Sequence, residues 1–227
     1  MEKFVCVRIV QAWGMDLSLF QFDWRVTWMA FLMNADRTIY ARYAARQIDD
    51  LEGLRKLLEK TLEVHERYPA NKASFEGKKG IALPWKTPEQ MPAISERGRF
   101  QPAENRKGCI HCHNVQEGAT KSFKSAGQPA PERFTAPYPT TQRVGFMLDS
   151  VDLARVIDVT SGSPADKGGL KAGDRIETFA GQAILSTADV QHALWSGPDA
   201  GAVPFTVERE GRKVDASLVL PAGWRSR

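Results

Sequence analysis

Two cysteines and a histidine near the middle of the chain have the spacing that covalent haem attachment requires. The segment from Cys109 to His113 reads C-x-x-C-H, which is the attachment pattern of c-type haem. Two thiols three positions apart can each form a thioether with one vinyl group of the same porphyrin. The histidine that follows can then bind the iron through an imidazole nitrogen. The motif therefore predicts haem c held by Cys109, Cys112 and His113, with His113 as the iron ligand.

A redox dithiol is the alternative use of the same two thiols. A thioredoxin-type C-x-x-C follows an apolar strand and lies at a helix N-terminus, which lowers the pKa of one thiol. Residues 101–108 are polar and charged instead, which disfavours the dithiol without excluding it. A structural zinc site needs a second ligand pair at a distance, and four donors within five residues are too close together to surround one ion.

A haem bound at His113 has a second axial position on its iron. Thioether or imidazole ligands for that position could come from Met91, Met147, His65 or His192. Met91 is the best placed of these, because it lies in the same stretch of the chain as the motif. An open sixth position is equally compatible with the sequence.

The overall composition is that of a water-soluble protein with one large domain or two small ones. The chain has 227 residues, of which 42% are hydrophobic and 26% charged. Its net charge of +4 is spread out, and no dense basic run suggests binding to nucleic acid. The apolar stretches Trp28–Met33 and Val214–Leu220 are too short to span a membrane. The N-terminus lacks the apolar core and the cleavage site of a secretory signal.

Residues 1–68 predict part of a small α/β domain. The apolar run Phe4–Val10 indicates a buried strand, and Thr27–Met33 with Thr38–Tyr43 indicates a hairpin. Asp49–Arg67 has leucines at helical spacing, with Asp49 or Asp50 as N-cap and Pro69 as terminator. This order of elements resembles the second half of a thioredoxin fold. The first half would lie upstream of the chain given, so we expect an N-terminally truncated reading frame.

Residues 69–140 are predicted to be a linker that carries the haem-type motif. The segment holds most of the chain's prolines and many charges, and Pro-broken stretches favour extended backbone. The segment is too short for a full helical cytochrome domain. A haem bound there would be covered by the flanking domains or by Pro-rich arms.

Residues 141–221 predict a compact, β-rich module. A strand over Ala154–Val159, a helix over Thr187–Trp195 capped by Ser186, and a hairpin over Val203–Leu220 follow in order. The module resembles the bacterial PDZ domain of the type attached to envelope proteases. The specific part of the resemblance runs from Ser163-Pro164-Ala165 to Gly173-Asp174.

The resemblance implies that the module binds the C-terminus of a peptide or protein as an added β-strand. The loop before the accepting strand would offer backbone N–H groups to the terminal carboxylate. Arg143 could add charge attraction, and Gly145 would allow the backbone an open angle. The residues expected to contact the peptide are Arg143, Val144, Gly145, Phe146 and Met147, with Thr187 and Gln191 from the helix. No Ser/His/Asp arrangement indicates a hydrolase.

Taken together, the three parts resemble a bacterial family of thioredoxin-like/PDZ (seleno)proteins. The matching stretches are Phe4–Arg8, Asp16–Asp23, Cys109–His113 and the PDZ core. The redox cysteine or selenocysteine of some relatives has no counterpart in this sequence. The expected fold class is α+β. The expected function is electron transfer in the periplasm or cell envelope, with a redox partner protein. A non-enzymatic peptide-binding scaffold and a thiol-disulfide oxidoreductase are the alternatives.

Overall fold

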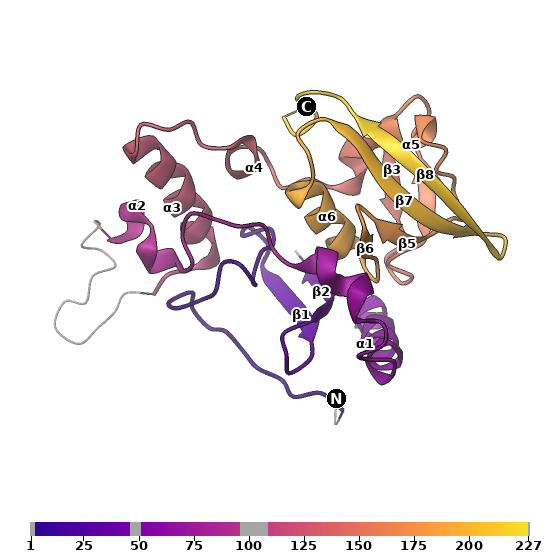
Figure 1. Cartoon of the computed structure of the whole chain (residues 1–227), viewed down its shortest axis with the longest axis horizontal. Helices are drawn as coiled ribbons and strands as arrows, with labels where there is room; N and C mark the ends of the chain where they lie inside the picture. Colours follow the sequence, from indigo (N-terminus) through magenta and orange to yellow (C-terminus); the bar gives the residue numbers. More distant parts are fainter. Residues whose placement is uncertain (1–2, 46–50, 96–108, 227) are drawn as a thin grey trace. The chain divides into compact units, whose positions relative to one another are not determined.

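The structure is a computed structural model that describes residues 3–45, 51–95 and 109–226 (Figure 1). The chain forms two compact units, each built from segments that are distant in sequence. One unit consists of Met1–Arg25 and Ala82–Thr135, and the other of Val26–Ile81 and Ala136–Arg227. This division differs from the predicted boundaries at 68 and 140, because the first predicted domain is split and much of the predicted linker is folded.

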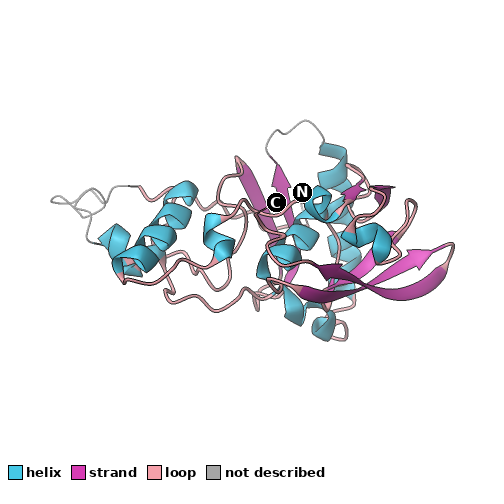
Figure 2. Ribbon diagram, turned by 90° about the horizontal axis from the view of Figure 1, so that it is seen from above, coloured by secondary structure: helices cyan, strands magenta, loops and turns pink. Residues whose placement is uncertain are grey.

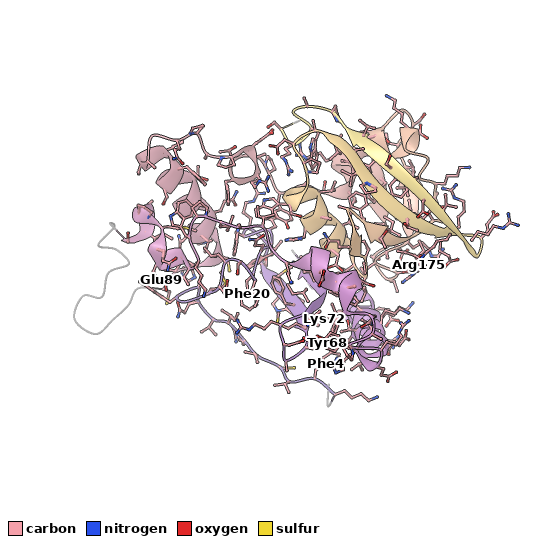
Figure 3. The ribbon with its side chains drawn as sticks, viewed as in Figure 1. Phe4, Phe20, Tyr68, Lys72, Glu89 and Arg175 are labelled. Atoms are coloured by element: carbon pink, nitrogen blue, oxygen red, sulfur yellow. The ribbon has the colours of Figure 1, made fainter. Side chains whose placement is uncertain are left out.

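A hairpin opens the larger unit, as the sequence predicts. Strands β1 (Trp28–Met33) and β2 (Ile39–Ala45) pair antiparallel. Asn34 closes the turn, because its side-chain Oδ1 accepts a hydrogen bond from the Thr38 N–H at 2.9 Å. Asp36 at the tip of the turn accepts a hydrogen bond from the Tyr68 hydroxyl and lies 3.4 Å from the Lys72 ammonium (Figure 3). The turn is therefore tied to the chain that follows the next helix.

Helix α1 (Leu51–Glu66) lies where helical spacing predicts it. Its predicted N-cap, Asp49 or Asp50, is outside the described residues. The buried face consists of Gly53, Leu57, Thr61 and Val64. Leu51, which was predicted on the apolar face, is 63% exposed. A 3-10 helix, η1 (Lys72–Lys78), completes the segment.

The prediction of a strand over Phe4–Val10 is wrong. These residues have no regular secondary structure, and the side chains of Val5 and Val7 are 93% and 83% exposed. A strand needs a neighbouring strand to satisfy its backbone groups, and the described residues place none beside this run. The thioredoxin-like half-fold is likewise not confirmed, because β1 and β2 form a two-stranded sheet of their own.

Residues 141–221 fold as the compact β-rich module that the sequence predicts. A two-stranded sheet, β3–β4, and a four-stranded sheet in the order β6-β5-β7-β8 enclose one hydrophobic core. The two nine-residue strands β7 and β8 form the long twisted ribbon in Figure 2. The elements are η3 (Thr141–Val144), β3 (Phe146–Leu148), β4 (Val156–Val159), α5 (Pro164–Lys167), β5 (Arg175–Phe179), β6 (Gln182–Ala183), α6 (Thr187–Ser196), β7 (Gly201–Arg209) and β8 (Arg212–Leu220).

The smaller unit folds much of the predicted linker. Helix α3 (Cys112–Ser125) packs on α2 (Pro92–Ser95), and α4 (Glu132–Thr135) follows. A 3-10 turn, η2 (Pro88–Gln90), precedes α2, and Glu89 within it accepts hydrogen bonds from the Gly14 N–H (Figure 3). The buried side of α3 is formed by Val115, Gly118, Ala119 and Ser122. Most of these residues are small, so the sequence shows little of the apolar periodicity that reveals a helix.

A buried ionic cluster joins residues 26–81 to the C-terminal module within the larger unit. The Asp189 carboxylate on α6 accepts hydrogen bonds from the backbone N–H groups of Arg42 and Leu185, each at 3.1 Å. The Lys78 ammonium lies 2.6 Å from its Oδ2. Arg42 and Lys78 have side chains that are 0% exposed, and burial lowers the pKa of Lys78 to about 8. Two cations and one anion are therefore enclosed together.

His192 lies one helical turn beyond Asp189, and its burial predicts a dependence of stability on acid. The pKa of His192 lies well below its usual value. Burial is the largest cause, and the positive charges of Arg42 and Lys78 lower the pKa further. Both ring nitrogens are buried without a hydrogen-bond partner in the described part of the chain. The unfolded chain binds a proton near pH 6.5, but the folded chain does not. Stability therefore falls as the pH drops below 6.5.

We expect His192→Leu to remove this dependence. Relative to the variant, the wild type should lose up to about 2 kcal/mol of unfolding free energy between pH 7 and pH 5, at about 1.36 kcal/mol per pH unit. At pH 7 the variant should be at least as stable, because it buries no unpaired polar group. Urea unfolding at a series of pH values measures both quantities. His65→Gln, at an exposed position of the same unit, is the control, and parallel curves for wild type and His192→Leu would contradict the prediction.

Candidate peptide-binding site

Gly145 shapes the loop that precedes strand β3. Its φ of +95° lies in the left-handed region, and it ends the 3-10 helix η3. A Cβ atom at this position would lie 2.1 Å from the Cβ of Ser163. Any other residue would be strained at this φ, and its Cβ would collide with Ser163. The position therefore requires glycine. The loop is therefore held in one conformation directly before the strand.

Strand β3 presents an open edge. The Thr160 N–H donates to the Gly145 carbonyl at 2.8 Å, which continues the ladder between β3 and β4. Backbone groups alternate sides along a strand, so those of Phe146 and Leu148 point to the opposite edge. In the described residues no other strand pairs with β3. The edge can therefore accept an extended chain.

Helix α6 carries the other residues of the predicted groove. The Ser186 hydroxyl caps the helix by accepting a hydrogen bond from the Asp189 N–H at 3.1 Å. Val190 and Leu194 are in the core of the module. Thr187 is half-buried, and its hydroxyl donates to the Leu153 carbonyl at 3.2 Å. Gln191, one turn further along the helix, is also half-buried.

The family model for PDZ domains matches residues 142–220. These residues form a PDZ domain. The match covers the Gly145 loop, both sheets and helix α6.

Relatives of this chain include proteins named as bacterial proteases. A protein named as a zinc metalloprotease of Brucella suis biovar 1 (strain 1330) is 41% identical over 64 residues, which are 28% of this chain and 17% of that protein. A DegP-like periplasmic serine endoprotease of Pseudomonas savastanoi pv. phaseolicola is 34% identical over 77 residues, which are 34% of this chain and 16% of that protein. The chain thus matches less than a fifth of either relative.

Solved structures that match this chain include the HtrA3 PDZ domain and a bacterial serine endoprotease. The HtrA3 PDZ domain bound to a phage-derived ligand is 22% identical, with a TM-score of 0.28, over 32% of this chain and 70% of that one. The serine endoprotease of Yersinia pestis is 13% identical, with a TM-score of 0.32, over 52% of this chain and 39% of that one.

The predicted peptide contacts in the PDZ domain fall into two groups. Val144 and Phe146 are 0% and 1% exposed and belong to the core, so they can reach a peptide only through their backbone. The side chain of Met147 is 40% exposed. The Arg143 guanidinium donates to the Arg225 carbonyl at 3.0 Å, which ties the loop to the C-terminal turn of the chain.

That C-terminal turn was not predicted from the sequence. Trp224 and Arg225 are each 2% exposed. The Trp224 indole donates to the Pro198 carbonyl at 3.3 Å, and Arg225 donates to the Gly197 carbonyl at 2.7 Å. The turn therefore packs on the chain that follows α6. A tryptophan just beyond the last predicted strand was the signal that the domain extends past residue 221.

The C-x-x-C-H motif lies in the smaller unit, at the start of helix α3. Cys109 and Cys112 have free, exposed thiols, and His113 is also exposed. Between them Ile110 is fully buried, and its carbonyl accepts a hydrogen bond from the Ala12 N–H at 2.8 Å. One buried residue thus anchors the motif while its thiols and imidazole remain accessible. Partial burial raises the pKa of the Cys112 thiol, which disfavours the thiolate that disulfide exchange needs.

The structure does not bring Met91 together with His113. Met91 is 0% exposed, and its sulfur lies 3.2 Å from the position of a Cβ on Gly118. Gly118 is on the buried side of α3, whereas His113 is exposed. Met91 is thus part of the core of its unit, and no contact supports it as the second axial ligand.

Within the described residues, no helix is long and apolar enough to cross a membrane.

Proposed function

We propose that this chain is a peptide-binding protein of the cell envelope, whose PDZ domain captures the C-terminus of a partner. The observation that carries the proposal is the open edge of β3 beside the Gly145 loop. A terminal carboxylate would bind at the loop, and the residues before it would pair with Phe146 and Leu148. The periplasmic name of the Pseudomonas relative supports the location.

The direction of the bound peptide follows from this arrangement. Its carboxylate lies at Gly145, where β3 begins, so the peptide must run antiparallel to β3. Its last residues pair with the three residues of β3. Residues further from its C-terminus pass Leu148 and reach the connection between β3 and β4.

Peptide arrays test this proposal with the full chain. Random tetrapeptides would be displayed on Gly-Ser spacers, each with a free C-terminal carboxylate and each repeated as a C-terminal amide. We expect binding to a subset of the free carboxylates and a loss of at least about tenfold for the matching amides, since a charged hydrogen-bond partner is removed. No binding, or equal binding to acids and amides, would overturn the proposal.

A second candidate function is electron transfer by haem c. Both thiols and His113 are exposed at one helix start, so the donor set fits covalent attachment. The group would be held by two thioethers from Cys109 and Cys112 and by the His113 imidazole. When bound, haem supplies one-electron transfer, here to a redox partner protein recruited through the PDZ domain.

Covalent haem content tests this second function. The chain would be secreted in a host with c-type haem maturation, and its visible spectrum would be recorded after denaturation. We expect a haem spectrum that Cys112→Ala reduces strongly, because one of two thioethers is lost, while Cys6→Ala leaves it unchanged. A spectrum without haem, together with two free thiols at Cys109 and Cys112, would contradict this function and leave peptide binding untouched.

A further inference from the structure

Helix α1 packs against the connection between β3 and β4, which is where an antiparallel peptide leaves the strand. The Cβ position of Gly53 lies 2.3 Å from the Ser150 carbonyl oxygen and 3.3 Å from the Leu153 side chain. Leu57, one turn along the helix, is buried in a cluster that includes Leu153 and Leu185. The approach is therefore close and apolar, and it depends on the missing side chain at Gly53.

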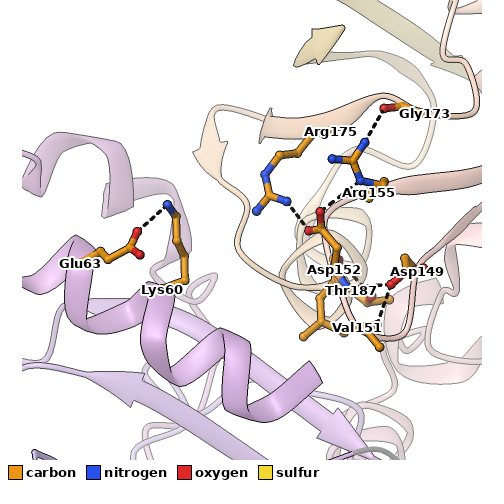
Figure 4. A network of polar contacts seen from close by, with 10 residues as sticks. Lys60, Glu63, Asp149, Val151, Asp152, Arg155, Gly173, Arg175 and Thr187 are labelled. Carbon is orange, nitrogen blue, oxygen red and sulfur yellow. Dashed lines mark hydrogen bonds and ion pairs between the residues drawn. The ribbon is translucent and has the colours of Figure 1, made fainter. Parts of the chain in front are cut away.

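The same connection is tied to the start of α6. The Thr187 hydroxyl donates to the Leu153 carbonyl, and Leu185 packs in the cluster around Leu57. The upstream end of the groove is thus bounded by three parts of the chain: the β3–β4 connection, the start of α6, and α1. Figure 4 shows the polar residues of this region, with Lys60 and Glu63 on α1 and the network around Asp152 beside it.

Charged side chains surround the connection between β3 and β4. Asp152 forms ion pairs with Arg155, at 3.2 Å, and with Arg175. Asp149 accepts hydrogen bonds from two backbone N–H groups, and the charge of Lys56 contributes to lowering the pKa of Asp149. Arg155 and Arg175 are thus paired with Asp152, whereas Lys56, one helical turn after Gly53, brings a positive charge toward the residue that follows β3.

We infer that α1 is a specificity-determining wall of the peptide groove, and that Lys56 selects acidic residues upstream of the ligand's last three or four. The inference rests on the proposed function, since it concerns the same bound peptide. At about 3.4 Å per residue, the fourth to sixth residues from the ligand's C-terminus lie opposite the connection that Gly53 contacts. In this inference an acidic side chain there pairs with the Lys56 ammonium.

The peptide array separates this inference from the proposed function. The same tetrapeptides would be displayed on Gly-Ser, Glu-Ser and Lys-Ser spacers, so that only the upstream residues differ. We expect tighter binding on Glu-Ser than on Gly-Ser, by about two- to fivefold at low salt, and weaker binding on Lys-Ser. The expected size is that of one exposed ion pair. Raising the salt concentration should reduce the difference.

Two variants and one matched control show which residues cause the spacer preference. Lys56→Glu should reverse the spacer preference, whereas Arg212→Glu, the same change in charge at an exposed position on β8, should leave it unchanged. Gly53→Ala should displace α1 from Ser150 and weaken the preference while tetrapeptides on Gly-Ser still bind. Equal binding on all three spacers, or a preference that Lys56→Glu does not alter, overturns the inference alone. Failure of every peptide to bind overturns the proposed function as well.

Discussion

Asp189→Asn is expected to destabilise the larger unit by about 3–5 kcal/mol. The Asp189 carboxylate is the anion of a fully buried cluster with Arg42 and Lys78. Asparagine keeps the shape, but its single carbonyl oxygen can accept from only one of the backbone N–H groups of Arg42 and Leu185, which bond to different oxygens of the carboxylate. It removes the negative charge, and breaking a buried ion pair in this way typically costs several kcal/mol because uncompensated charge remains inside. The free energy of unfolding in urea at pH 7 measures the effect.

Asp166→Asn is the matched control. Both aspartates are the third residue after a serine N-cap and have a side-chain role at the start of a helix, but Asp166 is exposed. Its loss should cost well under 1 kcal/mol. The deficit of Asp189→Asn should also shrink as the pH rises from 7 through about 8, since Lys78 in the folded wild type then loses its proton and no longer needs a carboxylate. Equal costs for the two variants, or a deficit independent of pH, would contradict the role assigned to the cluster.

Local signals in the sequence were sufficient for the elements that local chemistry determines. The turn at Asn34 and the cap at Ser186 depend on hydrogen bonds within four residues, so their sequence patterns predict them. The PDZ domain was predicted from a resemblance, whose specific part is the stretch from Ser163-Pro164-Ala165 to Gly173-Asp174. Its open edge at β3 follows from the position of the strand after Gly145.

Contacts between distant segments were not predictable in this way. Asp189 reads as an ordinary acidic residue in the first turn of a helix, and nothing near it in the sequence reveals that Arg42 and Lys78 enclose it. Met91 was predicted as a possible axial ligand because it lies in the same stretch of the chain as the motif, yet it is 0% exposed. The wall formed by α1 depends on Gly53 meeting Ser150, almost a hundred positions away, and a glycine inside a helix carries no such signal.

Gly145→Ala is expected to abolish peptide binding while the rest of the fold remains. The left-handed φ costs a residue with a Cβ about 1–2 kcal/mol. The collision with Ser163 adds the cost of overpacking, about 1–3 kcal/mol. The loop must move to relieve both, and it is the loop that would hold the terminal carboxylate. Binding to the tetrapeptide array should therefore fall by at least about tenfold, as the loss of 1.4 kcal/mol or more predicts.

Gly173→Ala is a control that separates the effect of backbone strain at a left-handed φ from the effect of the collision with Ser163. Gly173 has a φ of +93°, close to that of Gly145, but an added Cβ would meet no atom within 4 Å. This control should lose about 1–2 kcal/mol of stability and bind the array like the wild type.

A second test adds Ser163→Gly to Gly145→Ala, which removes the atoms that collide and costs only a few tenths of a kcal/mol in capping. Recovery of binding in the double variant assigns the loss to the contact between these two residues, whereas binding by Gly145→Ala itself would show that the loop does not hold the carboxylate.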